Sequence, residues 1–331
     1  MPLVVKCDNG MVTDTYLEII GDVFQSFGAS VKYTNNIKTA YSEPKDKVIV
    51  VARTIHAFQL MRKGYRHIVL WCQGVEPEES YMSHKSKIRY WVLSLMEHYI
   101  LTHAQFILFV SNEMRRHYEK KYSIKFDTSK YYCMPCMNTE IHIEAFQGTD
   151  KYKKNHFAYV GSLAPWQRFE DTVRVYKTIE NAGIPNCMLR VFTAQKIDAE
   201  RIVNENGVKN YSIEFVENEK LSEALVDVKY GFILREDTTV NRVATPTKIS
   251  TYLSCGMIPV YSDCLKDFSE CAKDMKYVVK CDSSLINKIQ MFQNVDKCEI
   301  LNEYSRIFKT YYSRSFHINK LKEKMKFLID K

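Results

Sequence analysis

Short apolar runs alternate with longer amphipathic segments along the whole chain. Each run has the length of a buried strand, and the segments between them repeat apolar residues at the spacing of a helix that faces a core. Strands that alternate with helices imply parallel sheets with right-handed crossovers. The expected strands are at 3–6, 31–33, 48–51, 68–71, 106–110 and 131–135, and then at 157–160, 188–192, 213–216, 231–234, 258–261 and 277–279.

One polar segment interrupts this alternation. Residues 141–155 contain Gly148 and a run of lysines, a composition typical of a linker. A chain of 331 residues is long enough for two domains, each with its own core. We therefore expect an α/β protein with Rossmann-like domains at 1–140 and 156–310, followed by a helical tail at 311–331.

The composition is that of a globular protein, with 46% hydrophobic and 26% charged residues. The net charge of +8 suits an anionic ligand or membrane surface without requiring nucleic acid. Most of the ten cysteines lie in apolar runs, and reduced cysteines favour the cytoplasm. Cys133 and Cys136 form a lone CxxC pair, which is weak evidence for zinc or redox chemistry. We expect neither a signal peptide nor a membrane-spanning helix.

The stretch from Tyr230 to Asp263 contains the strongest candidate site. An apolar run ends at Arg235, and a helix is expected to begin near Thr245, as its N-cap, with Lys248 in its first turn. The free N–H groups of a helix start, together with arginine and lysine, attract an anion. The alternative is an ordinary βαβ unit with solvated charges.

The run LREDTTVNRVATPTKISTYLSCGMIPV within this stretch resembles the donor-binding segment of GT-B glycosyltransferases, in particular the retaining enzymes of glycosyltransferase family 4 (group 1). The resemblance implies two Rossmann-like parallel-sheet domains that face a central cleft, with a C-terminal helix crossing back to the N-terminal domain. It also implies that this helix start receives the diphosphate of a nucleotide-sugar. Arg235 and Lys248 are the expected catalytic cations. The expected donor-binding residues here are Asn241, Pro246, Thr247 and Thr251.

Two further features concern the donor. The run HFAYVGSLAPWQR resembles the family's first strand and glycine turn, where Gly161 lets the backbone approach a phosphate, and Ser162 and Arg168 are expected to bind the donor. The family's two glutamates, eight positions apart, are replaced by Val243 and Thr251. The carboxylate that binds the ribose hydroxyls in the family is therefore missing.

The run WCQGVEPEESY is expected to be a loop at the rim of the first domain. Mutual repulsion among Glu76, Glu78 and Glu79 raises the pKa of at least one of them, as a general base or a sugar-hydroxyl acceptor needs. A solvated acidic loop is the alternative. Because bacterial glycosyltransferases have a similar loop facing the cleft, the resemblance assigns Glu78 and Glu79 to catalysis. The expected acceptor-side residues are Asn9, Gln73, Gly74 and Glu76.

A long helix is expected at 85–102, with aromatic and aliphatic residues on one face and Lys85, Lys87 and Arg89 at its start. Such a stripe is more often core, and we expect core here. The alternative is a basic amphipathic helix on a membrane, to which Arg115 and Arg116 would add charge.

These features predict a retaining, metal-independent hexosyltransferase. It would move a sugar from a nucleoside-diphosphate-sugar to a glycan or lipid-linked acceptor in the synthesis of a capsule or lipopolysaccharide type of surface polysaccharide. We expect a cytoplasmic protein with peripheral contact to an anionic membrane and no nucleic-acid partner. We also expect no cofactor and no metal, because P-loop, GxGxxG, HExxH and Asp-x-Asp patterns are absent. A non-catalytic GT-B-like binding subunit and a nucleotide-sugar epimerase are the alternatives.

Overall fold

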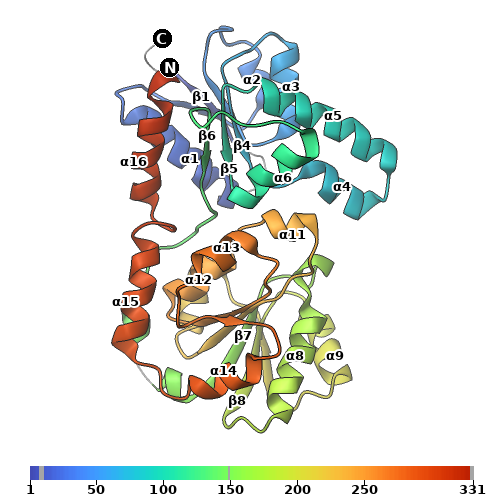
Figure 1. Cartoon of the computed structure of the whole chain (residues 1–331), viewed down its shortest axis with the longest axis vertical. Coiled ribbons are helices and arrows are strands. Elements are labelled where there is room, and N and C mark those ends of the chain that lie inside the picture. Colours follow the sequence, from blue (N-terminus) through green and yellow to red (C-terminus); the bar gives the residue numbers. More distant parts are fainter. Residues whose placement is uncertain (7–10, 148–149, 329–331) are drawn as a thin grey trace. The chain divides into compact units, whose positions relative to one another are not determined.

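The computed structural model describes residues 1–6, 11–147 and 150–328 and divides into two compact units. Unit 1 consists of Met1–Cys136, Arg242–Thr245 and Ser313–Lys331. Unit 2 consists of Met137–Asn241 and Pro246–Tyr312. Each unit has one six-stranded parallel sheet with helices around it (Figure 1). The strands expected from the sequence are all present, which confirms the α/β prediction.

Unit 1 has the strand order β2-β1-β3-β4-β5-β6. The chain therefore leaves β1 toward one side for β2 and returns to its other side for β3. The strands are β1 (Leu3–Val5), β2 (Lys32–Thr34), β3 (Ile49–Val51), β4 (Ile68–Cys72), β5 (Phe106–Phe109) and β6 (Tyr131–Cys133). The helices are α1 (Met11–Gln25), α2 (Ile37–Ala40), α3 (Thr54–Arg62), α4 (Glu76–His84), α5 (Lys87–His103), α6 (Asn112–Tyr122), α16 (Arg314–Met325) and the 3-10 turn η4 (Lys326–Leu328).

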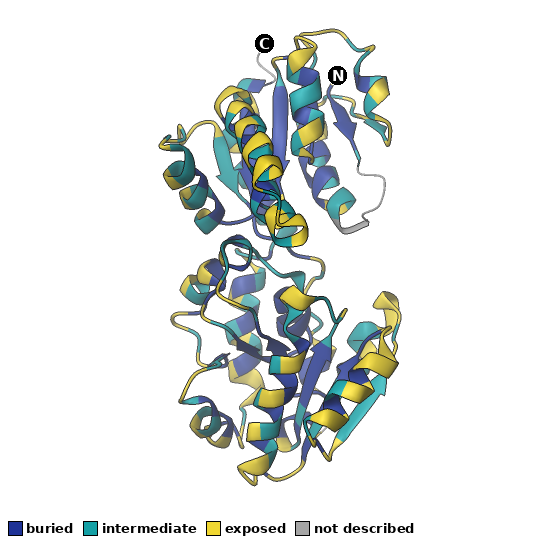
Figure 2. Cartoon of the chain, turned by 90° about the vertical axis from the view of Figure 1, so that its right-hand side faces the viewer, coloured by how far each residue is buried: buried dark blue, intermediate teal, exposed yellow. Residues whose placement is uncertain are grey.

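The middle strands of unit 1 are buried on both faces. Every residue of β3, β4 and β5 is buried, as parallel strands between two helix layers require. Figure 2 shows these strands as the dark interior of the unit. The C-terminal helix α16 packs on α1, where Arg314 forms an ion pair with Asp22.

Unit 2 has the strand order β12-β11-β10-β7-β8-β9, which is the doubly wound order 3-2-1-4-5-6 when read from β9. The strands are β7 (Asn155–Val160), β8 (Cys187–Phe192), β9 (Tyr211–Glu214), β10 (Tyr230–Ile233), β11 (Ile258–Tyr261) and β12 (Val279–Lys280). The helices are α7 (Glu144–Gln147), α8 (Phe169–Asn181), α9 (Lys196–Glu205), α10 (Leu221–Ala224), α12 (Thr247–Ser254), α13 (Lys266–Cys271), α14 (Leu285–Met291) and α15 (Lys297–Phe308), and α11 (Thr239–Val243) begins in unit 2 and ends in the segment assigned to unit 1. Three 3-10 turns are η1 (Lys151–Lys153), η2 (Pro165–Gln167) and η3 (Asn218–Lys220).

The two halves of the unit 2 sheet, β7–β9 and β10–β12, meet at the neighbouring strands β7 and β10, whose aromatic residues pack together. The ring of Phe157 stacks on Tyr230 at 4.6 Å between centroids and on Phe232 at 5.4 Å. Helix α12 lies close to β10 because Gly231 has no side chain. A Cβ at this position would come within 2.3 Å of the Tyr252 ring. This close packing places the start of α12 beside the ends of both strands.

One expectation about secondary structure is wrong. Residues 76–84 form helix α4 rather than a rim loop. Pro77 lies in the first turn, where its missing N–H removes no helical hydrogen bond, and the glutamates there interact favourably with the positive end of the helix. The acidic cluster is therefore a stable helix start.

Candidate functional site

The candidate site lies where the strand order of the unit 2 sheet reverses, between β7 and β10. The chain continues from β7 to β8 on one side and from β10 to β11 on the other, so the loops after β7 and β10 diverge at one point of the carboxyl edge. Such switch points are the usual ligand sites of open α/β sheets. Gly161 directly follows β7, and Arg235 follows β10 after one intervening residue.

Lys248 extends from the first turn of α12 to the glycine turn after β7. Its Nζ donates a hydrogen bond to Oε1 of Gln167 at 2.7 Å and lies 4.9 Å from the ring centre of Tyr159. A Cβ at Gly161 would be 2.8 Å from this Nζ, and the φ of +126° at Gly161 also favours glycine. The close approach of the lysine therefore depends on a glycine at this position.

Arg235 supplies a second cation to the same turn. Its Nη1 donates to the carbonyl oxygen of Trp166 at 2.7 Å, and its backbone N–H donates to Oγ of Ser262 at 2.9 Å. Burial, with repulsion from Arg235, lowers the pKa of Lys248 to about 7. Burial also lowers the pKa of Arg235.

Neither cation has a carboxylate partner within the part of the chain that the structure describes. Two partly buried cations that repel each other are unfavourable by themselves, and an anion between them would relieve this cost. The arrangement is therefore typical of a binding site for a phosphate or another strong anion.

The start of α12 adds hydrogen-bond donors. The N-cap is Pro246, and no side chain caps the helix, so the first-turn N–H groups lack a side-chain acceptor. The expectation that Thr245 caps this helix is wrong, because its Oγ1 accepts a hydrogen bond from the N–H of Cys136 at 3.0 Å. The helix start agrees with the sequence prediction within two residues.

Comparison with known proteins identifies the fold to which this architecture belongs. No protein-family model matches the sequence, and no curated protein matches it. The structure of WaaG, a glycosyltransferase involved in lipopolysaccharide biosynthesis, has a TM-score of 0.60 at 11% identity over 98% of this chain and 99% of that chain. A mutant of S. aureus TarM in complex with Fondaparinux, alpha-GlcNAc-glycerol and UDP has a TM-score of 0.59 at 12% identity over 89% of this chain.

The trehalose-6-phosphate protein from E. coli bound with UDP-2-fluoro glucose has a TM-score of 0.62 at 11% identity, covering 88% of this chain and 74% of that chain. The chain spans only 57% of the length of the TarM structures. These neighbours are GT-B glycosyltransferases. The chain has the GT-B fold.

Within this GT-B fold, the other predicted donor residues of the glycine turn are held by protein partners. The carbonyl oxygen of Ser162 accepts a hydrogen bond from the Tyr159 hydroxyl at 2.6 Å. Arg168 forms an ion pair with Asp171 and lies 3.7 Å from Glu236. Arg168 therefore already has negative partners, which distinguishes it from Lys248 and Arg235.

The side chains of Asn241 and Thr251 are also buried and hydrogen-bonded within the protein. Asn241 is buried, and its Nδ2 donates to the carbonyl oxygen of Glu236 at 3.0 Å. Thr251 is 8% exposed, and its Oγ1 donates to Oδ1 of Asn138 at 3.2 Å. Val243, at the other position where the family has glutamate, is buried too. The roles of Asn241 and Thr251 in donor binding stay predictions.

The three glutamates of α4 do not meet at one point. Glu76 Oε1 accepts from the N–H of Thr54, and Glu79 Oε1 accepts from the N–H of Val75, each at 3.1 Å. Glu78 instead pairs with Lys121 at 3.0 Å and contacts Nε2 of His117 at 3.2 Å. The roles of Glu78 and Glu79 in catalysis, and of Glu76 in acceptor binding, stay predictions.

The pKa values within this acidic cluster diverge. Desolvation of its carboxyl, with repulsion from Glu76 and Glu78, raises the pKa of Glu79, as the sequence predicts. Burial alone would raise the pKa of Glu78, but His117 and Lys121 outweigh it and lower this pKa. Desolvation therefore affects the pKa values of Glu78 and Glu79 more than the repulsion among the three glutamates does.

The remaining acceptor-side residues lie near the start of α4. Oε1 of Gln73 accepts from the hydroxyl of Thr13 at 2.9 Å, and the carbonyl oxygen of Gly74 accepts from the Tyr118 hydroxyl at 2.9 Å. A Cβ at Gly74 would be 2.1 Å from Oε1 of Glu79, so this close contact requires glycine. Asn9 lies outside the described residues.

The sequence did not identify three contributors to the site. Gln167, Tyr159 and the carbonyl group of Trp166 hold the two cations, but nothing local in LAPWQR predicts which residue faces Lys248. The one available signal was their position directly beside the glycine turn. Among the described residues, no group of three or more His, Cys, Asp or Glu side chains could hold a metal ion.

Proposed function

We propose that the chain is a glycosyltransferase whose nucleoside-diphosphate-sugar donor binds at the carboxyl edge of the unit 2 sheet. The observation that carries this proposal is the pair of cations, Lys248 and Arg235, which lie against the turn at Gly161 with no carboxylate partner among the described residues. The GT-B fold shared with WaaG, TarM and the trehalose-6-phosphate protein supports it. A diphosphate matches the charge, and the helix start supplies further donors.

The chemistry follows from where charge develops. During transfer, the bond between the anomeric carbon and a phosphate oxygen breaks, and a bond to an acceptor hydroxyl oxygen forms. Negative charge on the departing diphosphate grows toward the transition state, so groups aimed at it accelerate the chemical step. Lys248, Arg235 and the first N–H groups of α12 take this role.

We further propose the finer features that the family resemblance implies. The enzyme retains the anomeric configuration of its sugar and needs no metal, since cations and the helix start neutralise the diphosphate. Its acceptor is a glycan or a lipid-linked molecule of surface polysaccharide synthesis. It works at the inner face of the cell membrane, to which it binds peripherally.

A second candidate is a GT-B-like subunit that binds a ligand without turnover. The observation that favours it is Thr251, which occupies the position of the family's ribose-binding glutamate and is committed to Asn138. Such a subunit would bind a nucleotide through Lys248 and Arg235 but release no product. Binding without transfer would therefore distinguish it from an enzyme.

The decisive experiment offers a panel of nucleotide-sugars to the purified chain. Donor binding is measured by calorimetry, and sugar transfer or donor hydrolysis by release of the nucleoside diphosphate. Lys248→Ala tests the site, and Lys209→Ala is the matched control, because Lys209 is an exposed lysine at the amino edge of the same sheet. We expect release with the wild type and the control only.

Two further readouts test the finer proposals. NMR of the product should show the anomeric configuration of the donor, and EDTA should leave the rate unchanged. Binding without release for every donor would favour the non-catalytic subunit. No binding to any nucleotide-sugar would contradict both candidates.

A further inference from the structure

Helix α5 is turned with its apolar face outward. Ile88 is 81% exposed and Trp91 67%, although both are large hydrophobic residues. We call the exposed row on this helix the α5 stripe: Ile88, Trp91, Val92, Leu95 and Tyr99. The spacing of these residues places them along one side of the helix. The sequence-based expectation that this stripe is core is wrong.

The side of α5 that faces the protein contains a carboxylate. Glu97 is 3% exposed, and its Oε2 accepts hydrogen bonds from Nζ of Lys121 at 3.0 Å and from the Tyr122 hydroxyl at 2.5 Å. Burial raises the pKa of Glu97 to about 7, although Lys121 opposes the shift. Lys121 also pairs with Glu78 on α4, so this network ties α5 to α4 and α6.

This network explains the orientation of the helix. Rotating α5 to bury the stripe would expose Ile100 and Leu101 and would separate Glu97 from Lys121, leaving buried charges without partners. The outward stripe is therefore a fixed feature of unit 1. A continuous apolar row in water is unfavourable and marks a surface that something else covers.

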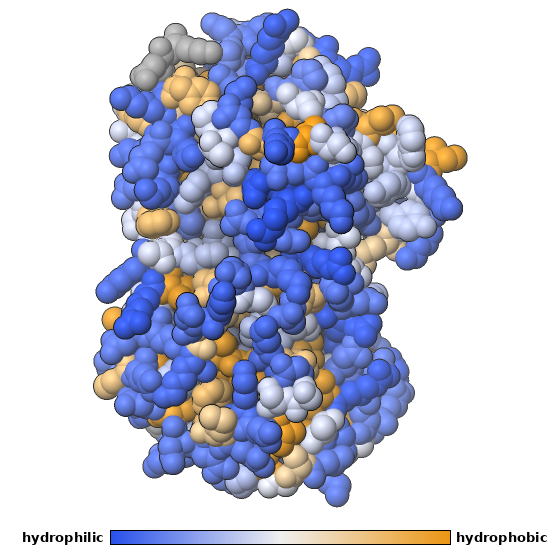
Figure 3. Space-filling view, viewed as in Figure 1, coloured by the Kyte–Doolittle hydropathy of each residue, from blue (hydrophilic) through white to orange (hydrophobic). Residues whose placement is uncertain are grey.

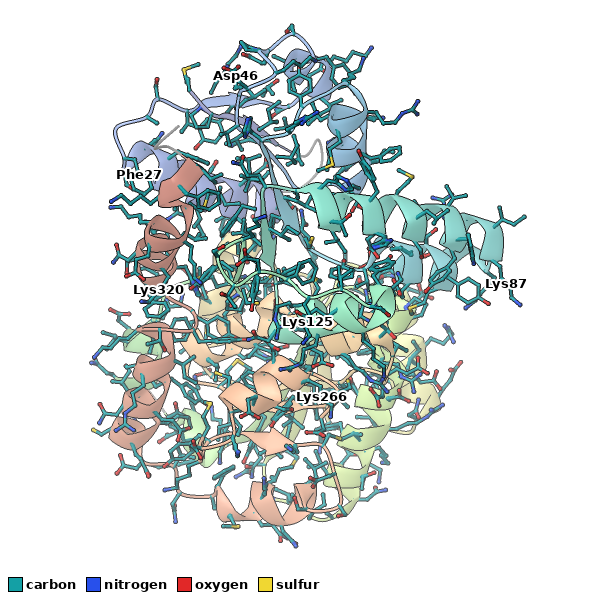
Figure 4. The ribbon with its side chains drawn as sticks, turned by 45° about the horizontal axis from the view of Figure 1, so that its top comes forward. Phe27, Asp46, Lys87, Lys125, Lys266 and Lys320 are labelled. Carbon is teal, nitrogen blue, oxygen red and sulfur yellow. The ribbon has the colours of Figure 1, made fainter. Side chains whose placement is uncertain are left out.

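The charge around the α5 stripe is basic. Lys85, Lys87 and Arg89 lie at the start of the helix and form no ion pair within the described ranges. The helix pair α4–α5 projects from the side of unit 1, with Lys87 at its outer end (Figures 1 and 4). Hydrophobic side chains are visible on this projection in Figure 3.

The acidic residues of α4 and α5 do not offset this charge. Glu78 and Glu97 pair with Lys121, while Glu76 and Glu79 lie in the first turn of α4, at the opposite end of that helix from Lys85. By contrast, Arg115, Arg116 and Lys121 of α6 each form an ion pair, with Glu119, Glu113 and Glu78 respectively. The α5 stripe is therefore flanked by positive charge that has no ion-pair partner among the described residues.

We propose that α5 lies in the headgroup region of an anionic membrane, with the α5 stripe inserted and the three basic residues bound to lipid phosphates. A helix that lies in the interface has an apolar side with aromatics and a lysine- or arginine-rich flank, as α5 does. A protein partner fits less well, because lysines are depleted from protein interfaces. No helix of the described residues is long and apolar enough to cross a membrane.

This inference rests on the membrane contact of the proposed function and deepens it by naming the surface through which the chain reaches a lipid-linked acceptor. The contact itself is independent of sugar transfer, so it is tested without turnover. Failure of vesicle binding would leave the donor site intact, and failure of donor binding would leave the membrane contact intact.

The test uses tryptophan fluorescence with vesicles of phosphatidylcholine, with and without phosphatidylglycerol. The chain has three tryptophans, of which Trp71 is buried and Trp166 lies in the glycine turn of unit 2. In a Trp166→Phe background, Trp91 is the exposed reporter. We expect a blue shift with anionic vesicles and quenching by brominated acyl chains, both absent with neutral vesicles.

Two variants test the residues involved. Trp91→Ser combined with Leu95→Ser should weaken sedimentation with anionic vesicles about tenfold or more, because both apolar contacts are lost. Lys85, Lys87 and Arg89 changed together to Gln should weaken it similarly at low salt. Ile197→Ser is the matched control, because Ile197 is 86% exposed on α9 of unit 2, and its removal should change nothing.

Three results would overturn the proposal. The first is a wild-type protein that stays in the supernatant with anionic vesicles at low salt. The second is equal loss in the Ile197→Ser control. The third is a lipid-free dimer, seen by analytical ultracentrifugation, that the Trp91→Ser and Leu95→Ser changes dissociate, since the stripe would then be a protein interface.

Discussion

The two units place charge at the carboxyl edges of similar sheets in opposite ways. In unit 2, Lys248 and Arg235 lie together with no carboxylate partner among the described residues. In unit 1, the glutamates that follow β4 each have a donor from the protein. A charged group that already has hydrogen-bond or ion-pair partners in the protein stabilises the fold, whereas a cation left without a carboxylate is available for a ligand.

The first way to test this contrast is to remove a cation of unit 2. Lys248→Ala should lower kcat on the order of a hundred- to a thousandfold, or about 3 to 4 kcal/mol, because its contact with the diphosphate strengthens in the transition state. Steady-state kinetics should show a much smaller change in KM for the donor. A normal kcat would remove the diphosphate role from this helix, and Lys209→Ala serves as the control.

In unit 1, removing a cation should damage stability instead. Lys121→Met leaves Glu78 and Glu97 without their shared partner, and breaking a fully buried pair costs about 3 to 5 kcal/mol. Because Lys121 is slightly exposed, we expect about 2 to 3 kcal/mol less unfolding free energy in urea. The exposed neighbour Lys120 provides the control Lys120→Met, and equal effects of the two changes would refute the argument.

The pH dependence of donor binding should report the pKa of Lys248 directly. The pKa of about 7 in the free protein means that the binding form, the ammonium, is present below pH 7 and lost above it. A bound diphosphate raises this pKa, so the affinity should fall about tenfold between pH 6 and pH 8. Calorimetry with a nucleotide-sugar, whose phosphates stay ionised throughout, checks this. The Lys248→Ala protein should show a flat profile.

The smallest effect concerns Thr251. Thr251→Val keeps the shape but removes the hydroxyl that bonds to Asn138, and should lower the unfolding free energy by about 1 kcal/mol. We expect kcat and the donor KM to stay unchanged, because this hydroxyl is committed within the protein. A clear rise in KM would instead restore the ribose contact that the family resemblance implies.

The sequence by itself determined the local structure and the chemistry of the main candidates. Periodicity predicted the strands of both sheets, because a strand or helix pattern depends on neighbouring residues alone. Local signals also identified Arg235 at a strand end and Lys248 at a helix start, whereas Gly161 was singled out by the family resemblance. Local signals did not distinguish the α4 helix from a loop, since Pro and Glu suit both a turn and a helix start.

Only the tertiary structure decided which of these residues meet. The pairing of β7 with β10 joins segments about seventy positions apart, and together with the packing of α12 on Gly231 it brings Gln167 and Gly161 to Lys248. The orientation of α5 likewise depends on Lys121, a partner on another helix that no local pattern indicates. Strand order depends on the packing of the whole unit. The rotation of α5 does too, because the buried charge of Glu97 needs a partner from another helix.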